Sequence, residues 1–203
     1  MYIPPANRVE DVAKTRAFIH AHGFATLVTS KQGIPWASHL PVLLDERDDG
    51  DRLRSHMARV NEQWRHFNPN EEVLCVFHGP HAYISPSWYS SKVAVPTWNY
   101  AVVHAYGIAK VEDDGFLRRV VEDTTLKYES KQASPWKLDL PDGTISSLMK
   151  AIVGFSIQIT RVETKFKLGQ NRSKEDQQGT LTALKRSVDG DSRSLADFIS
   201  NNS

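Results

Sequence analysis

Apolar and polar residues alternate along much of this chain with a period of two, the period of a β-strand that has two different faces. The longest such segment is TWNYAVVHAYGIAKVE, residues 97–112. Its large side chains share one face, and its small side chains share the other. The large face holds Trp98, Tyr100, Val102, His104, Tyr106 and Ile108, and the small face holds Thr97, Asn99, Ala101, Val103, Ala105, Gly107 and Ala109. We therefore expect a second layer of structure to approach this strand closely on its small face.

Shorter segments rich in β-branched and aromatic residues predict further strands. They cover residues 24–30, 34–44, 52–57, 72–79, 81–89 and 154–168, and Gly79-Pro80 is expected to separate the fourth from the fifth. The strands follow one another without regular strand–helix–strand alternation, which favours antiparallel pairing. The sequence therefore predicts a mainly β fold with peripheral helices (α+β), a closed or nearly closed antiparallel barrel.

Helical spacing is confined to a few segments. Asn7 and Glu10 have the spacing of a capping box, and apolar residues then recur at helical spacing to about His22, where Gly23 ends the helix. Residues 60–67 predict one or two helical turns. Longer helices are expected at about 113–129 and 142–152, and two short helices at the C-terminus.

Composition narrows the class of protein. A chain of 203 residues with a formal net charge of +1 suits one large domain or a domain with a short appendage. The balanced charge predicts no general attraction to nucleic acid or to an anionic membrane. The single cysteine, Cys75, lies in an apolar run and is expected to be a small buried hydrophobe. One cysteine and the absence of a charged-then-apolar leader predict a cytoplasmic protein, and no apolar run approaches the roughly 18 residues of a membrane span.

Motifs for several familiar sites are absent from the sequence. It contains no G-x-G-x-x-G or Walker loop for a nucleotide, and no H-E-x-x-H, C-x-x-C or G-x-S-x-G. The eight histidines lack the spacing of a dedicated metal site, so we expect them to form hydrogen bonds instead. The serines between Ser85 and Ser91 fit turn positions better than a catalytic nucleophile. No catalytic residue is identified.

Two stretches combine basic groups with planar side chains. Residues 55–64 hold Ser55, His56, Arg59, Asn61, Gln63 and Trp64, and residues 165–174 hold Lys165, Lys167, Gln170, Asn171 and Arg172. Arginine and lysine are the side chains that bind phosphate where no glycine loop is present. These residues by themselves are also compatible with a second interpretation, in which both stretches are ordinary polar surfaces.

Six blocks of the sequence resemble one known family. They are MYIPP at the start, SHLP (38–41), HMARVNEQW (56–64), FHGPHAYISPSWY (77–89), VPTWNY with its following VH (95–104) and KFKLGQNR (165–172). The chain is similar in these blocks to the PaiB-type family, the FMN-binding negative transcriptional regulators, which belong to the flavin-binding split barrels related to pyridoxamine-phosphate oxidase. The blocks span nearly the whole chain.

The resemblance implies an FMN-binding split barrel that forms a homodimer with FMN in a groove between subunits. It implies a split-barrel domain with peripheral helices over residues 1–170 and a C-terminal helical extension over 171–203, packed on the same domain. The implied cofactor-binding residues, from one subunit or from both, are Ser38, His39, Ser55, His56, Arg59, Asn61, Trp98, Tyr100, Lys167, Gln170 and Arg172.

The function implied by the resemblance is negative regulation of transcription. No helix-turn-helix with a basic recognition face is visible, so direct DNA binding is left open. One alternative is an FMN-dependent oxidoreductase acting on a small substrate, since the flavin itself supplies the chemistry. Another is a haem-binding relative, for which His39, His56, His81 and His104 are the candidate ligands.

Overall fold

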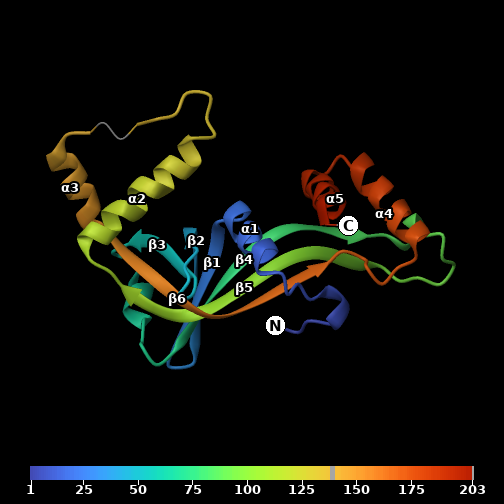
Figure 1. The fold of residues 1–203 in the computed structure, drawn as a ribbon, viewed down its shortest axis with the longest axis horizontal. Helices are drawn as coiled ribbons and strands as arrows, with labels where there is room; N and C mark the ends of the chain where they lie inside the picture. The colour runs from blue at the N-terminus through green and yellow to red at the C-terminus, as the bar shows by residue number, and fades with distance from the viewer. Residues whose placement is uncertain (138–139, 203) are drawn as a thin grey trace. The chain divides into compact units, whose positions relative to one another are not determined.

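The computed structural model describes residues 1–137 and 140–202 (Figure 1). Its helices are α1 (Val12–Ala21), α2 (Asp114–Glu129), α3 (Asp142–Lys150), α4 (Lys174–Arg186) and α5 (Gly190–Asn202). Its strands are β1 (Phe24–Lys31), β2 (Ile34–Asp45), β3 (Arg52–Ala58), β4 (Glu72–Ile84), β5 (Thr97–Val111) and β6 (Ile152–Lys167). Short 3-10 helices cover Pro5–Asn7 (η1), Glu62–His66 (η2) and Pro86–Trp88 (η3).

Within the described residues the strands close into a barrel in the order β1-β2-β3-β6-β5-β4. Strand β1 pairs antiparallel with β2 from Phe24↔Pro41 to Lys31↔Ile34, and also with β4. Strand β3 pairs antiparallel with β2 and with β6. The predicted mainly β fold with peripheral helices is confirmed.

The chain divides into two compact units. The first, which we call the terminal unit, comprises Met1–Phe18, His78–Val103 and Glu163–Ser203, and the second, the barrel unit, comprises Ile19–Phe77 and His104–Val162. Three boundaries fall inside strands, so β4, β5 and β6 each contribute residues to both units, and the boundary between Phe18 and Ile19 falls inside α1.

The core of the barrel unit is made by the inward faces of its strands. Its most deeply buried large side chains include Leu27, Leu53, Phe77 and Phe155, each at most 1% exposed. A Cβ on Gly107 of β5 would lie 2.2 Å from the carbonyl oxygen of Gln158. Gly107 therefore permits the close approach of the neighbouring strand β6, and the second layer expected on the small face of residues 97–112 stays a prediction.

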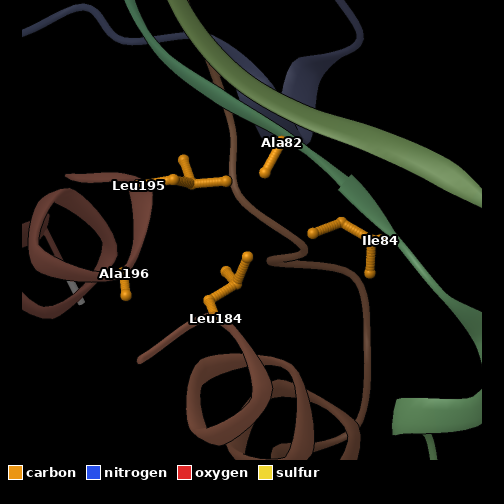
Figure 2. Close-up of a cluster of buried hydrophobic side chains, with 5 residues drawn as sticks. All are labelled: Ala82, Ile84, Leu184, Leu195 and Ala196. Carbon is orange, nitrogen blue, oxygen red and sulfur yellow. The ribbon is translucent and has the colours of Figure 1, made fainter. Parts of the chain in front are cut away.

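The terminal unit has its own hydrophobic cluster, drawn in Figure 2. Ala82 and Ile84 on β4 point toward Leu184 of α4 and Leu195 of α5. The two helices, red in Figure 1, pack on each other and on this strand face. The predicted C-terminal helices are confirmed, whereas the division into a split-barrel domain over residues 1–170 and a C-terminal extension over 171–203 stays a prediction.

The first helix begins later than the sequence indicated. Asn7 lies in the 3-10 helix η1, and α1 starts only at Val12. The cap is made instead by Asp11, whose carboxylate accepts a hydrogen bond from the Lys14 backbone N–H at 3.1 Å. Aspartate and asparagine cap helices about equally well, so spacing alone could not choose between the two positions.

The predicted break at Gly79-Pro80 is wrong, because β4 runs without interruption from Glu72 to Ile84. A Cβ on Gly79 would lie 2.6 Å from the ring of Phe18. Glycine is required here by the close approach of an aromatic ring and does not mark a turn. The strand ends instead at η3, where Ser85 caps Pro86–Trp88 by accepting a hydrogen bond from the Ser87 N–H.

Candidate functional site

The structure divides the predicted cofactor-binding residues between the two units. Ser38, His39, Ser55, His56, Arg59 and Asn61 lie in the barrel unit, and Trp98, Tyr100, Lys167, Gln170 and Arg172 lie in the terminal unit. Each unit therefore has its own set of candidate ligand-binding side chains.

Ser38 on β2 and Asn61, 23 residues later, are brought together. The Asn61 side-chain N–H group donates to the Ser38 hydroxyl at 2.8 Å. The Asn61 side-chain oxygen caps η2 by accepting from the Gln63 backbone N–H at 3.1 Å. This one amide therefore fixes the segment after β3 against β2.

Gln63 is the buried anchor of the same segment. Its side chain is 0% exposed, and its amide nitrogen donates to the carbonyl oxygens of Leu27 at 3.0 Å and Trp36 at 3.1 Å. In the sequence, Gln63 stands in the first basic stretch without a predicted role. The structure shows that it secures the segment holding Arg59 and Asn61 to β1 and β2.

Arg59 is exposed, but part of its guanidinium is already engaged. Its Nε and Nη2 donate to the carbonyl oxygens of Lys150 and Ile152, each at 2.8 Å. A guanidinium carries five N–H groups, so three remain without a hydrogen bond to the described residues. These three N–H groups can donate charge-assisted hydrogen bonds to an anion.

Ser55 and His56 occupy opposite faces of β3, as the period of two requires. Ser55 is 1% exposed and donates its hydroxyl to the carbonyl oxygen of Pro41 at 2.7 Å. The Nδ1 atom of His56 is buried and has no hydrogen-bond partner within the described residues. Burial lowers the pKa of His56, so its imidazole is neutral at pH 7. Of this pair, only His56 keeps a hydrogen-bonding group, Nδ1, that is not already engaged, because the Ser55 hydroxyl is bonded to the Pro41 carbonyl.

His39 lies on the exposed part of β2. Its Nδ1 is 3.0 Å from the hydroxyl of Thr26, and its ring is stacked with that of Phe24 at a centroid separation of 6.5 Å. Phe24 is 66% exposed, and Trp36 on the same strand as His39 is 44% exposed. The barrel unit therefore exposes flat apolar side chains on β2, which carries Ser38 and His39, and on its neighbour β1.

In the terminal unit, Trp98 and Tyr100 line a groove of about 380 Å³ together with His78 and His81 of β4. The rings of His81 and Trp98 are 6.2 Å apart between centroids and tilted by 34°. Tyr83 meets Trp98 edge-on, with centroids 6.1 Å apart. We call this feature the aromatic groove.

Lys167 borders the strand that carries Trp98. Its ammonium donates to the hydroxyl of Thr97 at 2.5 Å and to the carbonyl oxygen of Trp98 at 2.7 Å. Burial lowers the pKa of Lys167, and the positive charges of Lys165 and Arg172 act in the same direction. Lys165 lies against Tyr100, with Nζ 5.1 Å from the ring centroid.

Gln170 and Arg172 do not line the aromatic groove. The Gln170 amide closes its own loop, donating to the carbonyl oxygen of Phe166 and accepting from the Leu168 N–H at 2.8 Å. The Arg172 guanidinium lies over the ring of Tyr89, 4.7 Å from its centroid. Of the predicted residues of this unit, Trp98 and Tyr100 line the groove, Lys167 contacts the Trp98 backbone without lining it, and Gln170 and Arg172 lie aside.

Two features of the terminal unit escaped sequence reasoning. His78 and His81 line the groove together because β4 continues through Gly79, and the predicted break concealed their shared strand. Asp176, 1% exposed, accepts hydrogen bonds from Ser90 N at 2.8 Å, Ser91 N at 3.1 Å and the Ser91 hydroxyl at 2.6 Å. No local signal marked a contact between residues 85 positions apart.

The residues of the barrel unit fit the demands of a flavin mononucleotide. Its phosphate needs donors, and Arg59 has three N–H groups without a protein partner. The polar edge of the flavin ring needs hydrogen-bonding groups. The buried Nδ1 of His56 is such a group, and it has no hydrogen-bond partner within the described residues. Among the residues described, no group of three or more His, Cys, Asp or Glu is placed to hold a metal ion.

Comparison with known sequences identifies one matching family. A family model described as "Putative FMN-binding domain" matches residues 1–161. The chain is similar to the protease synthase and sporulation protein PAI 2 of Bacillus subtilis (strain 168). The two are 37% identical over 200 residues, which are 98% of this chain and 96% of that protein.

Solved structures show the same fold at low sequence identity. The FAD and haem binding protein from Mycobacterium smegmatis superposes with a TM-score of 0.62 at 13% identity, covering 84% of this chain and 78% of that one. The flavocytochrome Anf3 from Azotobacter vinelandii gives a TM-score of 0.58 at 14% identity, covering 83% and 73%. At these identities the likeness establishes the fold and nothing more.

Proposed function

Because this chain belongs to the family of FMN-binding domains, we propose that it binds FMN and acts as a negative transcriptional regulator of the PaiB type. The observation that carries FMN binding is the set of unused polar groups on the barrel unit. Arg59 keeps three N–H groups without a protein partner, and the buried Nδ1 of His56 keeps its hydrogen-bonding capacity.

Each residue of the barrel group has a proposed part in binding. Arg59 donates to the phosphate, and the Ser38–Asn61 pair holds the segment beside it. His56 and His39 contact the flavin ring, while Ser55 braces β3 against β2 through Pro41. FMN, when bound, supplies electron or hydride transfer, and these residues supply binding and orientation. The terminal group, Trp98, Tyr100, Lys167, Gln170 and Arg172, remains the sequence-based prediction for further flavin contacts.

We also propose that the protein is a homodimer. The support is the exposure of Phe24, Ile34 and Trp36 on β1 and β2, at 66%, 67% and 44%. Large apolar side chains gathered on neighbouring strands are typical of surfaces that bind a partner.

The regulatory role is supported by similarity to the protease synthase and sporulation protein PAI 2. A net charge of +1 favours indirect control of transcription over direct DNA binding. We place the protein in the cytoplasm, which its single, fully buried cysteine, Cys75, supports. None of the helices described in residues 1–137 and 140–202 combines the length and apolar character of a membrane span.

The visible spectrum of freshly purified protein, followed by titration with FMN, tests the cofactor proposal. We expect flavin absorbance, and we expect Arg59→Gln to weaken FMN binding by about tenfold or more, because it removes a charge-assisted contact to phosphate. Arg118→Gln is the matched control, since Arg118 is exposed on α2 and pairs only with Glu122 among the described residues. A colourless protein that also rejects added FMN would overturn the proposal.

A further inference from the structure

The strands of the terminal unit have two unlike faces. Ala82, Ile84 and Leu184 belong to the buried face, which packs against α4 and α5 (Figure 2). The opposite face exposes Trp98 at 53% and Tyr83 at 47%, and it carries the aromatic groove. We propose that the aromatic groove is a second binding site, separate from the flavin site, for a small planar aromatic carboxylate.

The ring-binding part of the groove is already arranged for stacking. Trp98 stands between His81 and Tyr83, with centroid separations of 6.2 Å and 6.1 Å. Aromatic rings attract one another at centroid separations of about 4.5–7 Å, face to face with an offset or edge to face. A planar ligand entering from solvent would cover the exposed indole of Trp98 and contact both neighbours. The volume of about 380 Å³ suits one or two fused rings.

Two lysines contact residues of the groove without lining it themselves, and neither has a matching carboxylate within the described residues. Lys165 contacts the Tyr100 ring and Lys167 bonds to the Trp98 carbonyl. Within the described residues neither lysine forms an ion pair with an aspartate or glutamate. Lys165 is only 7% exposed and donates to the carbonyl oxygen of Tyr2 at 3.0 Å. A buried cation without a counter-ion is costly, so an anion bound beside these lysines would be stabilised.

The number of free donors favours a carboxylate over the phosphate of FMN. An ammonium has three N–H groups, and Lys167 already uses two of them. The Gln170 amide is consumed by its own loop, and Arg172 covers Tyr89. One free N–H on Lys167, with the nearby charge of Lys165, matches a monoanion better than a phosphate dianion. The prediction that Trp98, Tyr100 and Lys167 contact FMN therefore competes directly with this proposal.

Isothermal titration with 2-naphthoate, and with its neutral analogue 2-naphthamide, tests the site in the full-length protein. We expect Lys167→Gln to weaken 2-naphthoate binding about tenfold, the effect of one charge-assisted hydrogen bond, and to leave 2-naphthamide unchanged. Trp98→Ala should weaken both ligands, because it removes the stacking surface. Trp98 is half exposed, so this change does not empty the core. Lys92→Gln, at an exposed lysine of the same unit, is the control.

Repeating the titration on FMN-saturated protein separates this site from the flavin site. Equal 2-naphthoate affinity with and without FMN supports the proposal. Competition by FMN would overturn it and assign the groove to the cofactor. The proposal would also be overturned if the protein did not bind 2-naphthoate. It would be overturned too if Lys167→Gln weakened the affinities for 2-naphthoate and 2-naphthamide equally. The titration of FMN-free protein with 2-naphthoate does not depend on FMN binding. Failure of the groove proposal therefore does not imply failure of the flavin proposal, and the reverse also holds.

Discussion

The hydroxyl of Ser91 donates a 2.6 Å hydrogen bond to the carboxylate of Asp176. Ser91 lies in the crossover between β4 and β5, and Asp176 lies in the first turn of α4. The same carboxylate accepts from the Ser90 and Ser91 backbone N–H groups. A Cβ on Gly179 would lie 2.1 Å from the carbonyl oxygen of Trp88, so α4 also approaches the start of the crossover closely. Helix α4 therefore holds the segment that leads into Trp98.

Replacing Asp176 with alanine is expected to release this crossover. Three hydrogen bonds would be lost, and the exposed Lys92–Val93 peptide bond would become a better trypsin site. We expect tryptic cleavage after Lys92 to be severalfold faster in Asp176→Ala than in the wild type, measured by mass spectrometry of timed digests. Asp176→Asn keeps an acceptor oxygen and should be intermediate. Equal cleavage rates in all three proteins would show that the carboxylate does not hold the crossover.

The same contact predicts a dependence of stability on pH. The hydrogen bond from the Ser91 hydroxyl, followed by those from the Ser91 and Ser90 backbone, lowers the pKa of Asp176 in the folded state. Its contribution is then complete above the unfolded pKa, about 3.9, and is lost as pH falls through the lower folded value. We expect the difference in Tm between the wild type and Asp176→Asn to be constant at neutral pH and to shrink below about pH 4. A difference that grew with acidity would contradict this assignment.

Gly79 is predicted to tolerate no side chain. A Cβ there would lie 2.6 Å from the Phe18 ring and 3.2 Å from the Ala101 carbonyl oxygen. Overpacking of this kind costs about 1–3 kcal/mol, so Gly79→Ala should lower the midpoint of urea unfolding without a large change in slope. Gly190→Ala is the control, because a Cβ on Gly190 would meet nothing within 4 Å. If both variants unfold at the wild-type midpoint, the close approach is not required.

Gln63 is predicted to link stability to flavin affinity. In Gln63→Met the carbonyl oxygens of Leu27 and Trp36 lose their donor, and leaving the buried Leu27 carbonyl unsatisfied costs about 1–3 kcal/mol. Urea unfolding should show this loss, and FMN titration should show weaker binding because Arg59 and Asn61 lose their anchor. Gln178→Met, at an exposed glutamine of α4, should change neither measurement. Normal FMN affinity in a destabilised Gln63→Met protein would separate Gln63 from the site.

Much of the fold was accessible from the sequence because strand periodicity is a local property. The two faces of residues 97–112 were predicted from alternation, and Ala101, Val103 and Ala105 of the small face are all at most 2% exposed. The start of α1 was not predictable, because capping residues stand at both Asn7 and Asp11. The continuity of β4 was not predictable either, since only the Phe18 ring explains Gly79.

The candidate site was less accessible because hydrogen bonds between distant residues leave no trace in local spacing. Arg59 was expected to serve a phosphate, yet two of its N–H groups bond to carbonyl oxygens about 90 residues away. Gln170 was placed with the basic residues, and its amide instead closes its own loop. Residue type indicated which hydrogen-bonding and charged groups were present. Only the three-dimensional structure showed which of these groups already have partners within the protein.

The burial of Cys75 makes this chain convenient for site-specific labelling. It is the sole cysteine, it is 0% exposed, and burial raises its pKa to about 12, so almost no thiolate exists at pH 7. A cysteine introduced at Val93, which is 94% exposed on the crossover, would therefore react with a maleimide, while the buried Cys75 thiol would not react. Spin labels or fluorophores can follow the crossover in the otherwise native sequence, without prior replacement of Cys75.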